Sequence, residues 1–335
     1  MADLKSKFMG IEIKNPIVVG SCNLSQDPET LIQLEKAGAA AIVYKSLFEE
    51  QIQYERMQMD DELHEFDERH AEMISIHPHL EHAGPKEYLA ELKKAKKSVS
   101  IPLIASLNAV YKETWVEYAQ LIEETGVDGL ELNFYITPRK ADQDDSEEKQ
   151  LETFRAVRKA VSIPLSVKLG PFYSNPLKII SKLDEAGANG FVLFNRLFYP
   201  DIDTQSEKIF SPFNLSNEGD YKLSLKFTGL LYNNVTANIC ANTGIFSGED
   251  VARMILAGAD CVQVVSALYK NKAQHIEKMV KNLDAWMKSK SHKSLDDFRG
   301  RLSDSVLKDP FAYARAQYVD ILMNPEKIIK KYPAI

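Results

Sequence analysis

Polar side chains that could do chemistry stand directly behind short apolar runs of this sequence, where strands are expected to end. They are Lys45, Ser46, Asn108, Asn133, Lys168 and Asn195. Lysine is rarely buried without a partner, so two lysines aimed at one site predict a ligand that is anionic or accepts electrons. Each of these residues taken alone could equally be structural, because amides commonly satisfy backbone groups at strand ends. Together they indicate one polar site.

Two further segments predict a phosphate site: ANTGIFSGED at 241–250 and VVSALY at 264–269. Each places a turn with backbone N–H groups ahead of a predicted helix, and helix starts of this kind hold anions. In an α/β barrel the phosphate site often lies after the last two strands, where these segments fall. The amides that would contribute belong to Gly244, Ser266 and Ala267. A plain structural turn is the alternative.

A repeated pattern identifies the elements that must position these residues. Four segments combine the end of a helix, a glycine and an apolar run: KAGAAAIVYKS, ETGVDGLELN, EAGANGFVLFN and LAGADCVQVVS, at 36–46, 124–133, 185–195 and 256–266. The glycine suits a helix C-terminal cap, and the apolar run suits a strand that is buried on both faces. The sequence therefore alternates helices with the strands of a parallel sheet.

The order of these elements predicts the fold. Strands are expected at 16–21, 40–46, 102–108, 128–133, 164–169, 190–195, 236–241 and 260–265. Helices are expected at 28–37, 85–98, 113–124, 147–161, 175–186, 222–233, 248–257 and 271–288. Eight alternating units favour an α/β fold of the (β/α)8 TIM barrel type over residues 1–288, with 289–335 as a helical extension packed on the barrel. A doubly wound sheet with a second domain is the alternative.

The length beyond a minimal barrel lies in two long loops, 47–84 after the second strand and 196–221 after the sixth. Both leave from the carboxyl ends of the strands, where barrel active sites lie, so we predict that they are lids. The first loop contains five of the seven histidines: His64, His70, His77, His79 and His82. The last three lie in a loop without a helical His-x-x-x-His pair, which favours a solvated segment and no metal site.

Composition argues against several classes of function. The 335 residues carry 41 Lys and Arg against 48 Asp and Glu, a formal charge of −7, which disfavours binding to nucleic acid through phosphate contacts. The three cysteines, Cys22, Cys240 and Cys261, show no CxxC spacing, so we expect no zinc and no iron–sulfur cluster held by this chain alone. No apolar run reaches the ~18 residues of a membrane helix and no signal peptide is visible, so a cytoplasmic protein without membrane contact is expected.

In several places the sequence resembles the dihydroorotate dehydrogenase family of FMN barrels, including the related C-terminal barrel of dihydropyrimidine dehydrogenase. The marks are NPIVVGS at 15–21, the Lys-Ser pair of VYKSL, ELN at 131–133, SVKL at 166–169, the Asn of LFNR at 193–196, ANTGI at 241–245 and GADCVQVVSALY at 258–269. SLDDFRGRLSD at 294–304 also resembles the tail of the dihydropyrimidine dehydrogenase barrel. The motifs are moderately specific one by one, and their order along the chain supports the assignment.

The resemblance implies a noncovalent FMN over the barrel mouth. The implied cofactor contacts are Gly20, Ser21, Lys45, Ser46, Asn133, Lys168, Gly244, Ser266 and Ala267, with the last three at the phosphate. Lys168 would lie against the N1/O2 edge of the ring, where a fixed cation stabilises the charge of the reduced flavin. Asn195 would face the substrate. Asn108 is added from strand geometry alone.

The sequence departs from the family at the catalytic base. Family members follow ELN with a loop that contains a Cys or Ser, which removes a proton from the dihydropyrimidine carbon as hydride passes to flavin. Here the segment reads NFYITPRK, which aligns either Thr137 or Ile136 with the base. Isoleucine cannot accept a proton, and an unactivated threonine is a poor base. The substrate loop after the second strand is also replaced, by ISIHPHLEHAGP. The candidate catalytic residues are Thr137, Lys45, Asn133 and Asn195.

These observations predict an FMN-dependent oxidoreductase that oxidises dihydroorotate to orotate, a step of pyrimidine biosynthesis, or reduces a related ring or enone. One alternative is a flavin reductase whose acid or base comes from Tyr135, Thr137 or the loop with His77, His79 and His82. Another is a catalytically weak flavoprotein that serves as an electron-transfer or regulatory partner. The expected partners are a small-molecule substrate and, from the family, a second protomer in a homodimer. A dihydrouridine synthase acting on transfer RNA is disfavoured by the acidic charge.

Overall fold

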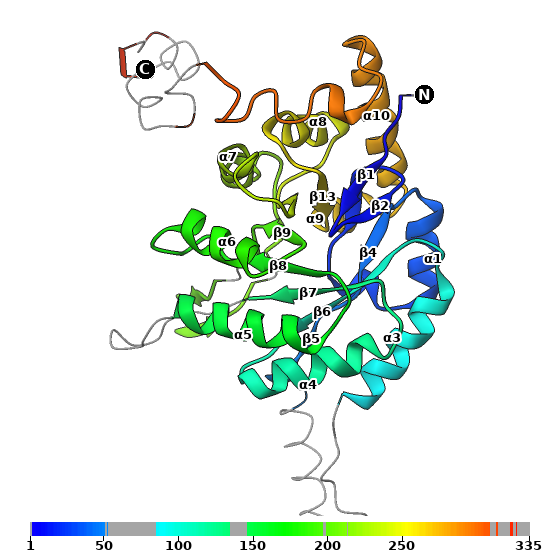
Figure 1. Ribbon diagram of the computed structural model, residues 1–335, viewed down its shortest axis with the longest axis vertical. Coiled ribbons are helices and arrows are strands. Elements are labelled where there is room, and N and C mark those ends of the chain that lie inside the picture. Colours follow the sequence, from blue (N-terminus) through cyan, green and yellow to red (C-terminus); the bar gives the residue numbers. More distant parts are fainter. Residues whose placement is uncertain are drawn as a thin grey trace, which may run out of the picture.

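Parallel strands form a closed barrel at the centre of the molecule (Figure 1). The computed structural model describes residues 2–50, 52, 85–134, 146–196, 199–212 and 214–308, with a few single positions beyond them. The barrel strands are β3 (Ile17–Val19), β4 (Ala41–Val43), β6 (Leu103–Asn108), β7 (Gly129–Asn133), β8 (Leu165–Leu169), β9 (Gly190–Leu193), β12 (Asn238–Asn242) and β13 (Cys261–Val264). They pair in the order β4, β3, β13, β12, β9, β8, β7, β6, and β4 pairs again with β6, which closes the ring. The predicted (β/α)8 barrel is confirmed.

Helices surround the strands on the outside of the barrel (Figure 1). They are α1 (Pro28–Lys36), α3 (Lys86–Ser98), α4 (Lys112–Glu123), α5 (Ser146–Ala160), α6 (Pro176–Glu185), α7 (Lys222–Leu231), α8 (Gly248–Ala257), α9 (Ser266–Asn271) and α10 (His275–Ser289). The side chains of Asp27, Asn175 and Ser247 cap α1, α6 and α8 by accepting a backbone N–H three residues on. Gly38 and Gly126 follow helices with φ of +103° and +83°, a conformation that glycine tolerates. The repeat of helix, glycine and strand is therefore present.

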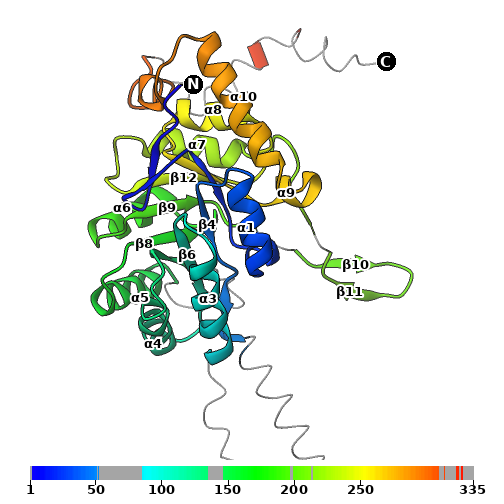
Figure 2. The same ribbon diagram turned by 90° about the vertical axis from the view of Figure 1, so that its right-hand side faces the viewer.

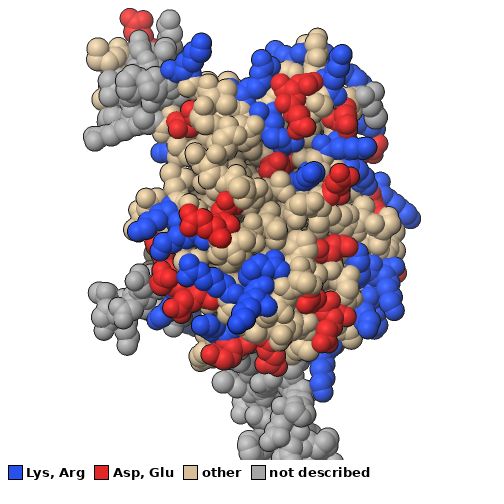
Figure 3. Space-filling view, viewed as in Figure 1, with Lys and Arg blue, Asp and Glu red and all other residues tan. Residues whose placement is uncertain are grey.

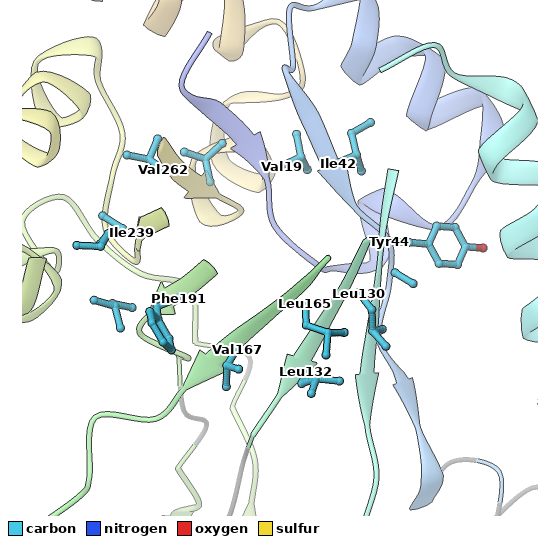
Figure 4. Close-up of a cluster of buried hydrophobic side chains, with 14 of the residues drawn as sticks. Val19, Ile42, Tyr44, Leu130, Leu132, Leu165, Val167, Phe191, Ile239 and Val262 are labelled. Carbon is cyan, nitrogen blue, oxygen red and sulfur yellow. The ribbon is translucent and has the colours of Figure 1, made fainter. Parts of the chain in front are cut away.

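Apolar side chains fill both faces of the barrel strands. Val19, Ile42 and Leu165 (Figure 4) are fully buried and belong to the larger cluster, which also includes apolar residues of the surrounding helices. Neighbouring residues in the strands, such as Val18 and Val43, point the other way and belong to a second buried cluster inside the barrel. Because both faces are buried, the strands read as continuous apolar runs, which is why their positions are predictable from sequence.

A hairpin near the amino terminus closes the end of the barrel opposite the carboxyl ends of the strands, and the sequence pattern does not predict it. Its strands are β1 (Ser6–Phe8) and β2 (Ile11–Ile13), antiparallel to each other. Met9, in the turn between them, is 1% exposed and belongs to the inner cluster. A Cβ at Gly129 would lie 2.8 Å from Met9 Cε, and one at Gly190 would lie 3.3 Å from Met9 Cγ. Glycine at the start of β7 and β9 therefore makes room for Met9.

The long loop after β9 contains a second hairpin, β10 (Asp201–Asp203) and β11 (Lys208–Phe210), which projects away from the barrel (Figure 2). Every residue of both strands is exposed. The chain then returns to the barrel mouth before α7. Residues 53–84 of the other long loop, with its five histidines, lie outside the described residues, so its predicted role as a lid stays a prediction.

Some boundaries differ from the sequence prediction. β4 ends at Val43 and β9 ends at Leu193, so Lys45 and Asn195 stand in loops just beyond the strands. A short strand, β5 (Leu47–Phe48), continues after β4 and pairs with the end of β6. The segment after β13 forms two helices, α9 and α10, where one was predicted at 271–288.

The predicted extension beyond residue 288 is described as far as residue 308, apart from single positions farther on. This part contains the 3-10 turn η2 (Leu295–Asp297), and Phe298 packs edge-on against Trp286 of α10, with ring centroids 5.0 Å apart. The backbone N–H of Gly300 donates to the carbonyl of Ile255 in α8 at 2.9 Å. The division of the chain at residue 288 stays a prediction.

Charged side chains of both signs are interspersed over the face shown in Figure 3. Lys182 of α6, for example, lies 3.3 Å from the carboxylate of Glu148 in α5. Within the described residues, no helix combines the length and the apolar character that crossing a bilayer requires.

Candidate active site

A cavity of about 290 Å³ opens at the carboxyl ends of the barrel strands. Its wall includes residues that follow β3, β9, β12 and β13, together with a side chain from β8. Six of them are predicted from sequence: Ser21, Lys168, Asn195, Gly244, Ser266 and Ala267. Convergence of several strand ends on one cavity is the usual construction of a barrel active site.

Lys168 brings a positive charge to the cavity. Its side chain is 8% exposed, and its Nζ lies 3.8 Å from Oε1 of the Glu131 carboxylate. Among the described residues, none accepts a hydrogen bond from this ammonium group. Within the described part of the chain, the ammonium of Lys168 thus has the Glu131 carboxylate as its ion-pair partner and also borders the cavity.

Glu131 and Gln263 belong to the same part of the barrel, although the sequence analysis does not single them out. Both side chains are almost completely buried, and Nε2 of Gln263 donates a hydrogen bond to Oε2 of Glu131 at 2.6 Å. Each is a polar residue within an apolar strand, in GLELN and CVQVV. That signal was available, because a buried acid is costly unless a partner faces it.

The predicted asparagines form a chain of hydrogen bonds behind the cavity wall. Asn195 lines the cavity and donates from Nδ2 to Oδ1 of Asn133 at 2.5 Å. Asn108 donates from Nδ2 to the backbone carbonyl of Asn133 at 2.9 Å. Asn108 and Asn133 are buried and lie outside the wall. Of the three, Asn195 lines the cavity, and the hydrogen bonds through Asn133 connect it to Asn108 behind the wall.

Three serine hydroxyls form a second chain. Oγ of Ser21, in the wall, lies 3.0 Å from Oγ of Ser46, and Ser46 lies 2.6 Å from Oγ of Ser106. Ser46 and Ser106 are buried. Ser46 therefore lies behind Ser21 and is connected to the cavity wall by this hydrogen bond.

Gly20 and Lys45 are not part of the cavity wall. A Cβ at Gly20 would lie 2.9 Å from Cγ2 of Val265 and 3.1 Å from Oε1 of Gln263, so close approach of β3 to β13 requires glycine. Nζ of Lys45 donates to Oε1 of Gln26 at 3.3 Å. The structure thus brings one of the two predicted lysines, Lys168, to the cavity.

The two predicted phosphate loops meet through Ser216, which the sequence analysis does not predict. Gly244, with φ of +71°, donates its backbone N–H to Oγ of Ser216 at 3.2 Å. Ser216 donates its own backbone N–H to Oγ of Ser266 at 2.9 Å. The loop after β9 therefore supplies a third side of the predicted phosphate site.

The starts of α8 and α9 differ in what they offer an anion. At α8 the side chains of Ser247 and Asp250 form a capping box, and Asp250 also accepts the N–H of Phe246 at 3.0 Å. At α9 the first residues are Ser266 and Ala267, whose N–H groups have no acceptor within the helix. The start of α9 is the one that remains open to the cavity.

Arg196 fixes the base of the long loop after β9. Its Nε donates to the carbonyl of Asn214 at 2.8 Å, and its Nη1 lies 3.3 Å from Oδ2 of Asp220. Asn214 and Ser216 line the cavity next to Arg196. The guanidinium of Arg196 therefore binds groups of this loop and holds the loop beside the cavity.

Cys22 also lines the cavity. Burial raises the pKa of its thiol, and hydrogen bonds from the backbone around Ser25 offset only part of this shift. The thiol is therefore protonated at neutral pH and is not prepared to accept a proton. The predicted candidates for a base, namely Tyr135, Thr137, His77, His79 and His82, lie outside the described residues, as does Ile136, so their roles stay predictions.

Comparisons with known proteins identify the family of this chain. The family described as dihydroorotate dehydrogenase matches residues 3–287. The catalytic subunit of dihydroorotate dehydrogenase B (NAD(+)) from Methanocaldococcus jannaschii is 26% identical over 316 residues, which cover 86% of this chain and 94% of the relative. The same subunit from Thermoplasma acidophilum is 25% identical over 311 residues, which cover 90% and 99%.

A relative that is not named as a dihydroorotate dehydrogenase matches a similar length of this chain. The NAD-dependent dihydropyrimidine dehydrogenase subunit PreA of Escherichia coli is 24% identical over 330 residues, which cover 91% of this chain and 78% of the relative. The family match includes every barrel strand described above. The chain therefore belongs to the dihydroorotate dehydrogenase family.

Proposed function

We propose that this chain is an FMN-dependent oxidoreductase that exchanges hydride with a carbon–carbon bond of a small dihydropyrimidine-like ring, with dihydroorotate as the first candidate. Enzymes of its family are oxidoreductases that act on CH–CH groups and bind FMN. The observation that carries the proposal is a single cavity whose wall includes both the start of α9 and Lys168. A ligand with an anionic end and an electron-accepting ring fits this combination.

The phosphate end of FMN fits the residues at the start of α9. Ser266 and Ala267 would donate backbone N–H groups, and a helix start favours a negative charge. Gly244 would allow its loop to lie close to the backbone that leads into α7, because a Cβ at this position would lie 2.7 Å from the backbone nitrogen of Tyr221. These residues form a compact site because Ser216 joins them.

The ring of FMN fits the part of the cavity between Ser21 and Lys168. FMN supplies the acceptor or donor of hydride when bound. Lys168 would place its ammonium at the ring edge that becomes negative on reduction, and a preorganised cation there lowers the barrier. Gly20 would keep the end of β3 close to β13. Ser46 would hold the hydroxyl of Ser21 in place through their hydrogen bond.

Asn195 would orient the substrate. Its Nδ2 is held by Asn133, which leaves its carbonyl oxygen as an acceptor for a ring N–H. Asn108 supports Asn133 from β6 and would act indirectly. The predicted catalytic role of Lys45 has less support, because its ammonium is directed to Gln26.

We expect purified protein to be yellow and to carry about one noncovalent FMN per chain. The reason is the combined phosphate and Lys168 site. The measurement is the absorbance spectrum of the protein, followed by identification of the flavin released on denaturation. FAD is not expected, because no GxGxxG turn opens a βαβ unit here. A colourless protein that takes up no added FMN would contradict the proposed function.

We expect Thr137→Val and Thr137→Cys to leave the rate of flavin reduction by dihydroorotate nearly unchanged, and that rate to be low in the parent protein. The loop NFYITPRK offers no neighbouring group that would clearly activate the Thr137 hydroxyl. Anaerobic stopped-flow reduction of the FMN-loaded protein measures the rate, with NADH and NADPH as comparison reductants.

Two other outcomes of this experiment would be informative. If Thr137→Val abolishes reduction while Thr137→Cys preserves or raises it, Thr137 is the base, because a thiol with a pKa near 8.5 yields far more anion than an alcohol. If the parent is reduced rapidly and Thr137→Val has no effect, the base lies outside this loop. His77, His79 and His82 would then be tested first.

A further inference from the structure

A buried acid lies next to the lysine of the cavity. The Glu131 side chain is 0% exposed, and its Oε1 is 3.8 Å from Nζ of Lys168. Its other oxygen accepts a hydrogen bond from Gln263 across the barrel at 2.6 Å. Oε1 itself accepts no hydrogen bond from the described residues, so the ammonium of Lys168 is its electrostatic partner.

The register of the strands places Glu131 one layer deeper than Lys168. Asn133 of β7 pairs with Lys168 of β8, and Glu131 pairs with Ser166. Residues two apart in a strand share a face, so Glu131 and Ser166 lie beneath Asn133 and Lys168 inside the barrel. A ligand that meets Lys168 from the cavity side therefore has Glu131 behind the ammonium.

Packing alone does not account for an acid at this position. Much of the inner cluster of the barrel is apolar, with Val18, Ile104 and Val192 fully buried. A carboxylate costs free energy in such surroundings, and well-packed apolar residues commonly replace a buried ion pair without loss of stability. The acid is therefore better explained by what it does to Lys168.

We propose that Glu131 is a positioning residue that holds the ammonium of Lys168 at the cavity floor and offsets part of its charge, so that it sets the reduction potential of the bound flavin. This inference rests on the proposed function, in which Lys168 faces the flavin. Lys168 stabilises the negative charge of the reduced ring, and a carboxylate behind it opposes that stabilisation. Gln263 fixes the carboxylate by its hydrogen bond to Oε2.

The test is Glu131→Gln, which keeps the size of the side chain and removes the charge. We expect the reduction potential to rise and the Kd for sulfite, which reports the same local charge, to fall about tenfold, because one buried charge is lost close to the ring. A tenfold change in a two-electron equilibrium corresponds to about 30 mV. Equilibration with a redox dye measures the potential, and a visible titration measures sulfite binding.

The matched control is Asp128→Asn, which removes the same charge from the residue just before β7. Asp128 pairs with Lys96 of α3 at 2.5 Å and accepts the N–H of Leu103 at the opposite end of the strand from the cavity. We expect the reduction potential of the flavin bound to Asp128→Asn, and the affinity of this variant for sulfite, to equal those of the parent. Glu131→Met provides a second way to remove the charge without requiring a hydrogen-bond partner, and we expect the same rise.

The outcomes separate the inference from the proposed function. A parent protein that binds no FMN would overturn both. A parent that binds FMN, together with an unchanged or lowered potential in Glu131→Gln, would overturn the inference alone. If neither Glu131 variant folds while Asp128→Asn does, Glu131 is required for the barrel itself and the inference is also wrong.

Discussion

Lys168→Ala is expected to slow the reduction of bound FMN by substrate about 10²–10³-fold, the usual cost of losing one preorganised electrostatic contact. The variant removes the cation that would face the negative edge of the reduced ring. It also removes the ammonium that lies 3.8 Å from the buried carboxylate of Glu131, which then keeps only the hydrogen bond from Gln263 among the partners described above. Both effects lower the flavin potential. Stopped-flow reduction and the midpoint potential are the measurements.

Lys182→Ala is the matched control for this prediction. Lys182 lies on the outside of the barrel and pairs with Glu148 at 3.3 Å, so the variant loses the same charge far from the cavity. We expect it to bind FMN and to be reduced like the parent. If Lys168→Ala behaves in the same way as Lys182→Ala, Lys168 is structural and our placement of the ring edge is wrong.

Gly244→Ala is expected to weaken FMN binding about tenfold or more. The residue has φ of +71°, and an added Cβ would lie 2.7 Å from the backbone nitrogen of Tyr221 and 2.8 Å from that of Asp220. Backbone atoms cannot turn aside as side chains can, so one of the two loops must move. Strain of this kind costs about 1–3 kcal/mol, and every 1.4 kcal/mol is about tenfold in Kd. Fluorescence titration of the apoprotein with FMN measures the affinity.

Gly126→Ala is the control that shows which property of Gly244 weakens FMN binding, the crowding around an added Cβ or the positive φ of the backbone. Gly126 has a similar φ of +83°, but an added Cβ there would meet no atom within 4 Å. It lies between α4 and the amino end of β7, whereas the cavity lies at the carboxyl ends of the strands. We expect a modest loss of thermal stability and parental FMN affinity. Equal affinities in Gly126→Ala and Gly244→Ala would show that the crowding at Gly244 does not act on the site.

The barrel was predictable because the sequence pattern that specifies each of its units is short and recurs along the chain. A helix end, a glycine such as Gly38 or Gly126 and an apolar run recur along the chain, and each combination specifies one unit. Polar residues at the ends of those runs then identify the rim. Lys168 and Asn195 are two such residues, and both line the cavity.

Other features depend on contacts between distant parts of the chain. Glu131 is visible in the sequence as an acid within an apolar strand, but a strand buried on both faces does not reveal that this residue points inward. Ser216 reaches the predicted phosphate site only through the path of a long loop. Lys45 stands in the loop just beyond β4, where its ammonium donates a hydrogen bond to Gln26. The β1 and β2 hairpin has strands of three residues each, too short for a periodic pattern.

The hairpin that closes the barrel has a consequence for folding during synthesis. Its partners lie far along the chain: Met9 packs at Gly129 and Gly190, and the N–H of Gly10 donates to Oδ1 of Asn238 at 2.8 Å. During synthesis the hairpin leaves the ribosome ahead of these partners, and more than 200 further residues must follow Gly10 before its contact with Asn238 can form. The partners of this hairpin are therefore all synthesised after it, and the apolar side chain of Met9 stays exposed on the nascent chain until they appear.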